Sequence, residues 1–124
     1  MRLLLDTHVV LWLLQEPERL GQRAVAALRA ESVNLVSVVT FIEVGIKVAT
    51  GKLVKPDGFD TSTPGERLLP ITPVHGLALE QLPRHHRDPW DRLLIVQAMA
   101  EDLTIVTADP EFTKYDVRVI DASL

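Results

Sequence analysis

The chain has 124 residues, a formal net charge of −4 and no cysteine. This length suits one domain and is too short for two, so we expect residues 1–124 to form a single domain. The lack of cysteine excludes disulfides, thiolate catalysis and cysteine zinc sites, and it predicts a cytoplasmic protein. A generic nucleic-acid binder would normally be basic. The sequence predicts neither a membrane span nor a signal peptide, since polar residues break every long apolar run.

Strands and helices are predicted to alternate along the chain. Short apolar runs predict strands at residues 3–5, 35–36, 68–71, 104–107 and 117–120. Helical propensity and capping residues predict helices at 7–14, 21–31, 75–82 and 89–101, with a further helix that Ser37 or Thr40 caps and that ends at Thr50 before Gly51. Residues 54–66 are rich in Pro and Gly and are predicted to form a loop. This alternation predicts a three-layer α/β/α sandwich around a central, mainly parallel sheet.

Four acidic residues occupy equivalent places in this predicted fold. Asp6 follows the first strand, Asp109 follows the fourth, Glu43 lies in the opening turns of the helix after the second strand, and Asp91 lies in the first turn of the helix before the fourth. The crevice of an open parallel sheet lies beyond the carboxyl ends of its strands, so all four should meet there. Two carboxylates about 5 Å apart repel by about 3 kcal/mol at an effective dielectric of about 20, so the cluster requires protonation or a cation.

Oxygen ligands alone favour Mg²⁺ or Mn²⁺, and hard cations held by carboxylates hydrolyse phosphodiesters without a side-chain nucleophile. Each acid also has a simpler interpretation. Asp6 is a candidate helix cap, Glu43 is spaced to pair with Lys47, and Asp109 precedes a proline that starts a turn. Asp88 fits a helix N-cap better than a metal ligand. The shared location of the four acids favours the metal site over four separate explanations.

Basic and aromatic residues supply further candidates. Arg87 and Arg92 flank Asp91 and are predicted to bind substrate phosphate, whereas His85 and His86 match no zinc spacing and are interpreted as part of a solvated basic loop. Trp12 is interpreted as core, dimer contact or partner-binding surface. A glycine inside a helix is destabilising by about 1 kcal/mol relative to alanine, so Gly45 predicts a close-packed neighbour.

The ordered set of motifs resembles the PIN-domain ribonucleases, and within them the VapC-type toxins of bacterial toxin–antitoxin pairs. The matching segments are Leu5 to His8, Ser37 to Glu43, His86 to Leu94 and Thr107 to Asp109. The resemblance implies an Mg²⁺- or Mn²⁺-dependent ribonuclease with an acidic metal site of Asp6, Glu43, Asp91 and Asp109, with Asp88 as an accessory ligand. Thr107 and Ser37 would orient carboxylates or water. It also implies an RNA substrate, a homodimer and a small antitoxin, whereas residues 54–67 depart from the family pattern.

Two other functions remain open. A PIN-like module without strong catalysis would serve only as a binding surface. A receiver-type phosphoacceptor domain has a similar length and an acidic pocket, but it needs paired acids after the first strand and a lysine near the end of the fifth. Here Asp6 is followed by Thr7, and residues 117–120 lead to Asp121.

Overall fold

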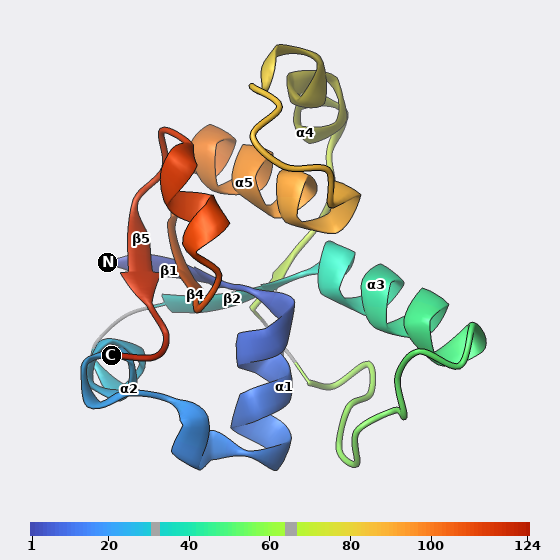
Figure 1. The fold of residues 1–124 in the computed structure, drawn as a ribbon, viewed down its shortest axis with the longest axis vertical. Coiled ribbons are helices and arrows are strands. Elements are labelled where there is room, and N and C mark those ends of the chain that lie inside the picture. The colour runs from blue at the N-terminus through green and yellow to red at the C-terminus, as the bar shows by residue number, and fades with distance from the viewer. Residues whose placement is uncertain (31–32, 64–66) are drawn as a thin grey trace.

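Five parallel strands form the centre of the computed structural model, which describes residues 1–30, 33–63 and 67–124 (Figure 1). The strands are β1 (Arg2–Leu5), β2 (Val33–Ser37), β3 (Leu68–Leu69), β4 (Thr104–Thr107) and β5 (Val119–Asp121). Their order in the sheet is β3-β2-β1-β4-β5, and every neighbouring pair is parallel. The predicted α/β class with a parallel sheet is therefore confirmed.

Helices connect the strands. They are α1 (Thr7–Gln15), α2 (Gln22–Arg29), α3 (Val38–Ala49), α4 (Pro73–Ala78) and α5 (Pro89–Glu101), with 3-10 turns η1 (Pro17–Arg19), η2 (Leu79–Gln81) and η3 (Pro110–Lys114). α3 begins and ends as predicted, because the Ser37 hydroxyl caps it and Gly51 follows its end with a φ of 73°. β3 is shorter than predicted, since Pro70 has no N–H for the ladder.

The strands alternate their side chains between two cores, one on each face of the sheet. Leu4 and Ile105 pack with Leu94 and Ile95 of α5 on one face. Leu3 and Leu5 pack on the other face with residues of α1 and α3, notably Val9, Val10 and Val44. Figure 1 shows α4 and α5 above the sheet and α1 and α2 below it. The three-layer arrangement follows from this period-two alternation.

The chain changes direction across the sheet between β1 and β4. From β1 it continues to β2 and β3 on one side, whereas β4 leads to β5 on the other. Leu5 pairs with Val106, and the Asp6 amide donates to the Val106 carbonyl at 3.0 Å. A crevice for ligands forms at such a switch point, beyond the carboxyl ends of the strands. The fold therefore places Asp6 and Asp109 together at the carboxyl ends of β1 and β4.

Two further predictions concern α3 and the segment after it. Residues 52–63 form turns with no helix, as predicted for the loop, and the rest of the predicted loop at 64–66 lies outside the described residues. The prediction that Gly45 has a close-packed neighbour is wrong, because a Cβ added at Gly45 would meet no atom within 4 Å. Gly45 instead lines an open apolar groove of about 430 Å³ between α3 and Phe59. In the described ranges, no helix is long and apolar enough to cross a membrane.

Candidate active site

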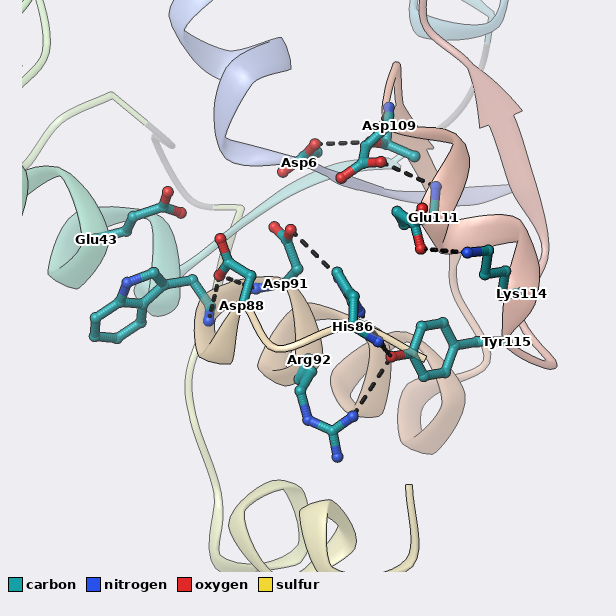
Figure 2. Close-up of polar contacts among 12 residues, drawn as sticks. Asp6, Glu43, His86, Asp88, Asp91, Arg92, Asp109, Glu111, Lys114 and Tyr115 are labelled. Carbon is teal, nitrogen blue, oxygen red and sulfur yellow. Dashed lines mark hydrogen bonds and ion pairs between the residues drawn. The ribbon is translucent and has the colours of Figure 1, made fainter. Parts of the chain in front are cut away.

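Asp6 is the residue that the sheet fixes most firmly. It lies at the start of α1 and is 4% exposed, yet its side chain makes no capping hydrogen bond. Instead, the Thr107 hydroxyl donates to Asp6 Oδ2 at 2.7 Å and accepts from the Asp109 amide at 3.1 Å. Burial raises the pKa of Asp6, and the hydrogen bond from Thr107 opposes that shift. The simpler interpretation of Asp6 as a side-chain cap therefore fails, and its side chain lies near those of Asp109 and Asp91 (Figure 2).

Asp109 and Thr107 follow the end of β4. The Asp109 carboxylate accepts from the Glu111 amide at 2.9 Å and so caps the short helix η3. The predicted role of Thr107 in orienting a carboxylate agrees with its contact to Asp6. Ser37 differs, because its hydroxyl donates to Gln97 Oε1 at 2.5 Å and accepts from the Val39 amide. In these contacts Ser37 caps α3 and joins it to α5, and its hydroxyl bonds no carboxylate.

Asp88 and Asp91 open α5. Asp88 Oδ1 accepts from the amides of Trp90 and Asp91 at 2.9 and 3.1 Å, which is the predicted N-cap. These bonds hold the first turn of α5, from which Asp91 extends toward the crevice (Figure 2). The pKa of Asp91 is raised to about 8, mainly by burial and also by the charges of Asp6, Asp88, Glu43 and Asp109. The pKa of Asp91 therefore depends on the charge of each of the other acids.

Glu43 reaches the same region from α3. Its carboxylate is almost completely buried, and Lys47 donates to Oε2 at 2.6 Å, so the predicted pair of Glu43 and Lys47 is present. This hydrogen bond raises the pKa of Lys47. The other carboxylate oxygen, Oε1, is buried with no hydrogen-bond partner among the described residues. An unpaired buried oxygen is destabilising, so it is available to a ligand.

The four acids thus lie around the switch point: Asp6, Asp91 and Asp109 at the starts of α1, α5 and η3, and Glu43 in the middle of α3. Figure 2 shows Asp6, Asp88, Asp91 and Asp109 around a common space, with Glu43 extending toward it from α3. Among the described residues, no three acidic or histidine side chains are close enough together to hold an ion. The donors are all carboxylate oxygens, one of them unpaired, and their chemistry fits Mg²⁺ or Mn²⁺. Binding would require side-chain movement that gathers them.

His86 is the site residue that sequence reasoning missed. It was predicted to be solvated, but its side chain is 13% exposed and its Nε2 lies 3.5 Å from Asp91 Oδ2. The Tyr115 hydroxyl lies 2.7 Å from His86 Nδ1 and accepts from the His86 amide and Arg92 Nη1. Because a hydroxyl has one proton, Tyr115 donates it to Nδ1, so neutral His86 carries its proton on Nε2, toward Asp91. The one sequence signal was its position just before the Asp88-Pro89 helix start.

Two cavities flank the acids. One of about 310 Å³ lies between α1 and α3 and includes Thr7, Glu43, Lys47 and Lys52 in its lining. The other, of about 570 Å³, is lined by Arg84, His86, Arg87 and Arg92. The predicted substrate-binding residues Arg87 and Arg92 therefore share one cavity beside Asp91. A path with basic groups on both sides of an acidic centre suits a polyanion.

Comparisons with known proteins identify the family. The sequence matches the PIN domain family model over residues 3–118, so the chain belongs to the PIN domain family. This membership argues against the receiver-domain alternative. A search of curated proteins found no match.

Solved structures share the fold at low sequence identity. FitAB bound to the IR36 DNA fragment is similar with a TM-score of 0.72 and 20% identity, over 98% of this chain and 96% of that one. VapBC2 from Rickettsia felis, bound to a promoter DNA fragment, is similar with a TM-score of 0.71 and 16% sequence identity, over 98% of both chains. VapBC-1 from nontypeable Haemophilus influenzae is similar with a TM-score of 0.62 and 18% sequence identity, over 100% of both chains. These likenesses establish the fold over essentially the whole chain.

Proposed function

We propose that this protein is an Mg²⁺- or Mn²⁺-dependent endoribonuclease that acts as the VapC-type toxin of a type II toxin–antitoxin system. Membership of the PIN domain family and the fold shared with VapBC and FitAB structures support this proposal. The observation that carries it is the charge distribution at the switch point. Burial raises the pKa of Asp91, and the charges of Asp6, Asp88, Glu43 and Asp109 add to that shift, as expected for a carboxylate site that gains stability from a cation.

The metal ligands would be Asp6, Glu43, Asp91 and Asp109, with Asp88 mainly holding the first turn of α5. When bound, the cation would activate water and neutralise charge on the scissile phosphate. Thr107 orients Asp6 through its hydrogen bond, and the proton on His86 Nε2 faces Asp91. The N-terminal ends of α1 and α5 add partial positive charge near the phosphate. In this proposal the chain positions the cation and the phosphate and stabilises their charges, and it supplies no side-chain nucleophile.

The proposed partners are an RNA substrate, a small antitoxin and a second copy of the chain in a homodimer, in the cytoplasm, with residues 1–124 as one domain. An antitoxin would inhibit by placing a basic side chain, such as arginine, among the carboxylates. The apolar surface that α1 offers such a partner consists mainly of Leu13 and Leu14, which are 41% and 39% exposed. Val9 is completely buried in the core, and the Arg19 guanidinium lies over the Trp12 ring, with Cζ 4.9 Å from the ring centroid.

The decisive experiment incubates the purified protein with defined single-stranded RNAs, with Mn²⁺, with Mg²⁺ and with EDTA. We expect site-specific cleavage with either cation and none with EDTA. The competing function is a catalytically weak binding module, which the separation of the carboxylates favours. That alternative predicts RNA or partner binding with no cleavage under any metal condition. Mapping the cleaved ends would then identify the preferred sequence.

A further inference from the structure

The cavity of about 570 Å³ behind His86 has an unusual chemical composition. Its lining consists of Arg84, His86, Arg87 and Arg92, with no acidic residue. The whole protein carries a net charge of −4, so this concentration of positive charge is not a general property of its surface. A basic cavity in an acidic protein indicates a specific anionic ligand.

The three arginines of the cavity have no carboxylate partner in the described ranges. Within the described residues, the ion pairs of lysine and arginine involve Arg19, Lys47, Lys114 and Arg118. Of the described residues that line the cavity, His86 alone lies beside a carboxylate, that of Asp91. Arg92 donates to the carbonyls of Pro83 and Leu82 at 2.8 and 3.2 Å, which fixes its guanidinium without neutralising it. A fixed guanidinium is a good anion ligand, because its orientation is already determined.

The cavity adjoins the carboxylate site through one side chain. His86 lines the cavity, and its Nε2 lies 3.5 Å from Asp91 Oδ2 (Figure 2). In the same figure Asp91 and Arg92 lie on opposite sides of His86. A strand whose scissile phosphate lies at the carboxylates and that continues past His86 would present a neighbouring phosphate to the arginines. Planar arginine forks bind phosphate oxygens through two parallel hydrogen bonds.

We propose that this cavity is a binding site for a phosphate of the RNA strand next to the scissile one. The inference rests on the proposed ribonuclease function and adds a requirement to it: efficient substrates carry a charged phosphate beyond the bond that is cut. Arg84 and Arg87 are exposed and supply mobile contacts, whereas Arg92 is held by the loop carbonyls and supplies a fixed one. The cavity thereby sets the register of the strand over the carboxylates.

The test pairs protein variants with modified RNAs. The variant is Arg84→Gln with Arg87→Gln, which leaves Arg92 and its loop intact, and Arg29→Gln on the exposed surface of α2 is the matched control. Short RNAs carry either normal phosphates or one neutral methylphosphonate, placed immediately 5′ or immediately 3′ of the scissile bond. For the parent and the control, one of these two replacements should raise the KM roughly tenfold or more, as expected for loss of charge-assisted hydrogen bonds. For the double variant, the same replacement should have little further effect.

Binding to the Asp6→Asn variant separates this inference from the proposed activity, because it needs no cleavage. Fluorescence anisotropy would compare Asp6→Asn with and without the two arginine substitutions, using each RNA and several salt concentrations. Arginine-dependent discrimination between the charged and neutral linkages supports the site, even if the parent protein cuts no RNA. Equal discrimination with and without the arginines overturns it.

Discussion

The two halves of the acidic site are built in different ways. At the ends of β1 and β4, Asp6 is fixed by the parallel sheet and by the hydroxyl of Thr107, and the polar groups there are paired. At the start of α5, Asp91 is held by the helix cap from Asp88, and the one ion-pair contact of its carboxylate within the described residues is with His86 Nε2 at 3.5 Å. The pKa of Asp91 is raised to about 8 by burial and by the other acids.

The sheet therefore fixes the position of one part of the acidic site, and side-chain contacts at the start of α5 fix the position of the other. The β1–β4 half has its geometry fixed by the strands before any ligand binds. The α5 half depends on side-chain contacts across the chain and on electrostatic repulsion, so a cation should change it more. Loss of any of the four proposed ligands should therefore remove most of the activity, whereas loss of a supporting contact should have a larger effect in the first half, at Thr107, than in the second, at Tyr115.

The largest effect is expected for Asp6→Asn. The substitution keeps the shape of the side chain but removes a charged ligand, so RNA cleavage should fall at least roughly a hundredfold. Far-ultraviolet circular dichroism should be unchanged, and the melting temperature without metal should rise, because a buried charge and its repulsion of Asp91 are lost. Rates are measured on a defined RNA with Mn²⁺.

The control for this variant is Asp57→Asn in the exposed turn after α3, which should cleave at the parental rate. An Asp6→Asn protein that cleaves RNA as fast as the parent would exclude Asp6 from the metal site. It would also remove the main contrast between the two halves.

Thr107→Val should have the next largest effect. It removes the hydrogen bond to Asp6 Oδ2 and the acceptor of the Asp109 amide while keeping the buried volume. We expect a roughly tenfold to hundredfold loss of cleavage, as for other residues that orient ligands, and a free energy of unfolding lower by about 1–3 kcal/mol. The matched control is Thr104→Val, a buried threonine at the other end of β4, which should leave cleavage unchanged. Equal losses in both variants would indicate a general effect on β4.

Much of the β1–β4 half could be predicted from the sequence, because its structure follows from residues that are close together in the chain. A short apolar run followed by an acid predicts a strand and its carboxyl end, and parallel strands bring such ends together. The helix starts at Ser37 and Asp88 also followed from local capping signals. These features depend on neighbours within a few residues of each position.

The features that the sequence did not predict depend on distant contacts. His86 meets Tyr115, which lies 29 positions away, and Ser37 bonds Gln97, which lies 60 positions away. The residues around His86 in the sequence indicate a positively charged segment, but they do not indicate which way the His86 side chain points. The sequence alone therefore favours a solvated loop. The Gly45 prediction failed for a related reason: propensity gives the energetic penalty of a helical glycine but does not identify what lies beside it.

The third prediction concerns pH and the metal. The pKa of Asp91 is about 8 in the folded protein, against an ordinary value of 3.8, so the folded state keeps a proton that the unfolded state releases. The resulting stabilisation is complete below about pH 3.8 and is lost as the pH rises through about 8. Without metal, the melting temperature of the parent should therefore fall between pH 5 and pH 9 more steeply than that of Asp91→Asn.

Mn²⁺ should act in the opposite direction. Protons compete with the cation for Asp91, so the rise in melting temperature at saturating Mn²⁺ should be larger at pH 8.5 than at pH 6. Differential scanning fluorimetry measures both effects, with the exposed Asp57→Asn as control. A Mn²⁺ shift that is the same at both pH values, or that persists in Asp91→Asn, would place the cation away from α5.

The smallest effect is expected for Tyr115→Phe, which tests the side-chain contacts of the α5 half. The change removes a hydroxyl that lies 2.7 Å from His86 Nδ1 and accepts from Arg92, while the buried ring remains. Losing one such group lowers the free energy of unfolding by about 1 kcal/mol. Cleavage should fall less than about tenfold, since Asp91 keeps its backbone position through Asp88.

A double-mutant cycle with His86→Gln shows whether the hydroxyl acts through the imidazole. If it does, the double variant should cleave no more slowly than His86→Gln alone, because the second change removes an interaction that is already lost. His85→Gln is the control, since His85 is exposed and meets the Tyr115 ring only edge-on at 4.8 Å. Additive losses would show that Tyr115 acts independently of His86. A loss as large as that of Asp6→Asn would mean that the α5 half is as essential as the sheet half, and the contrast between them would then fail.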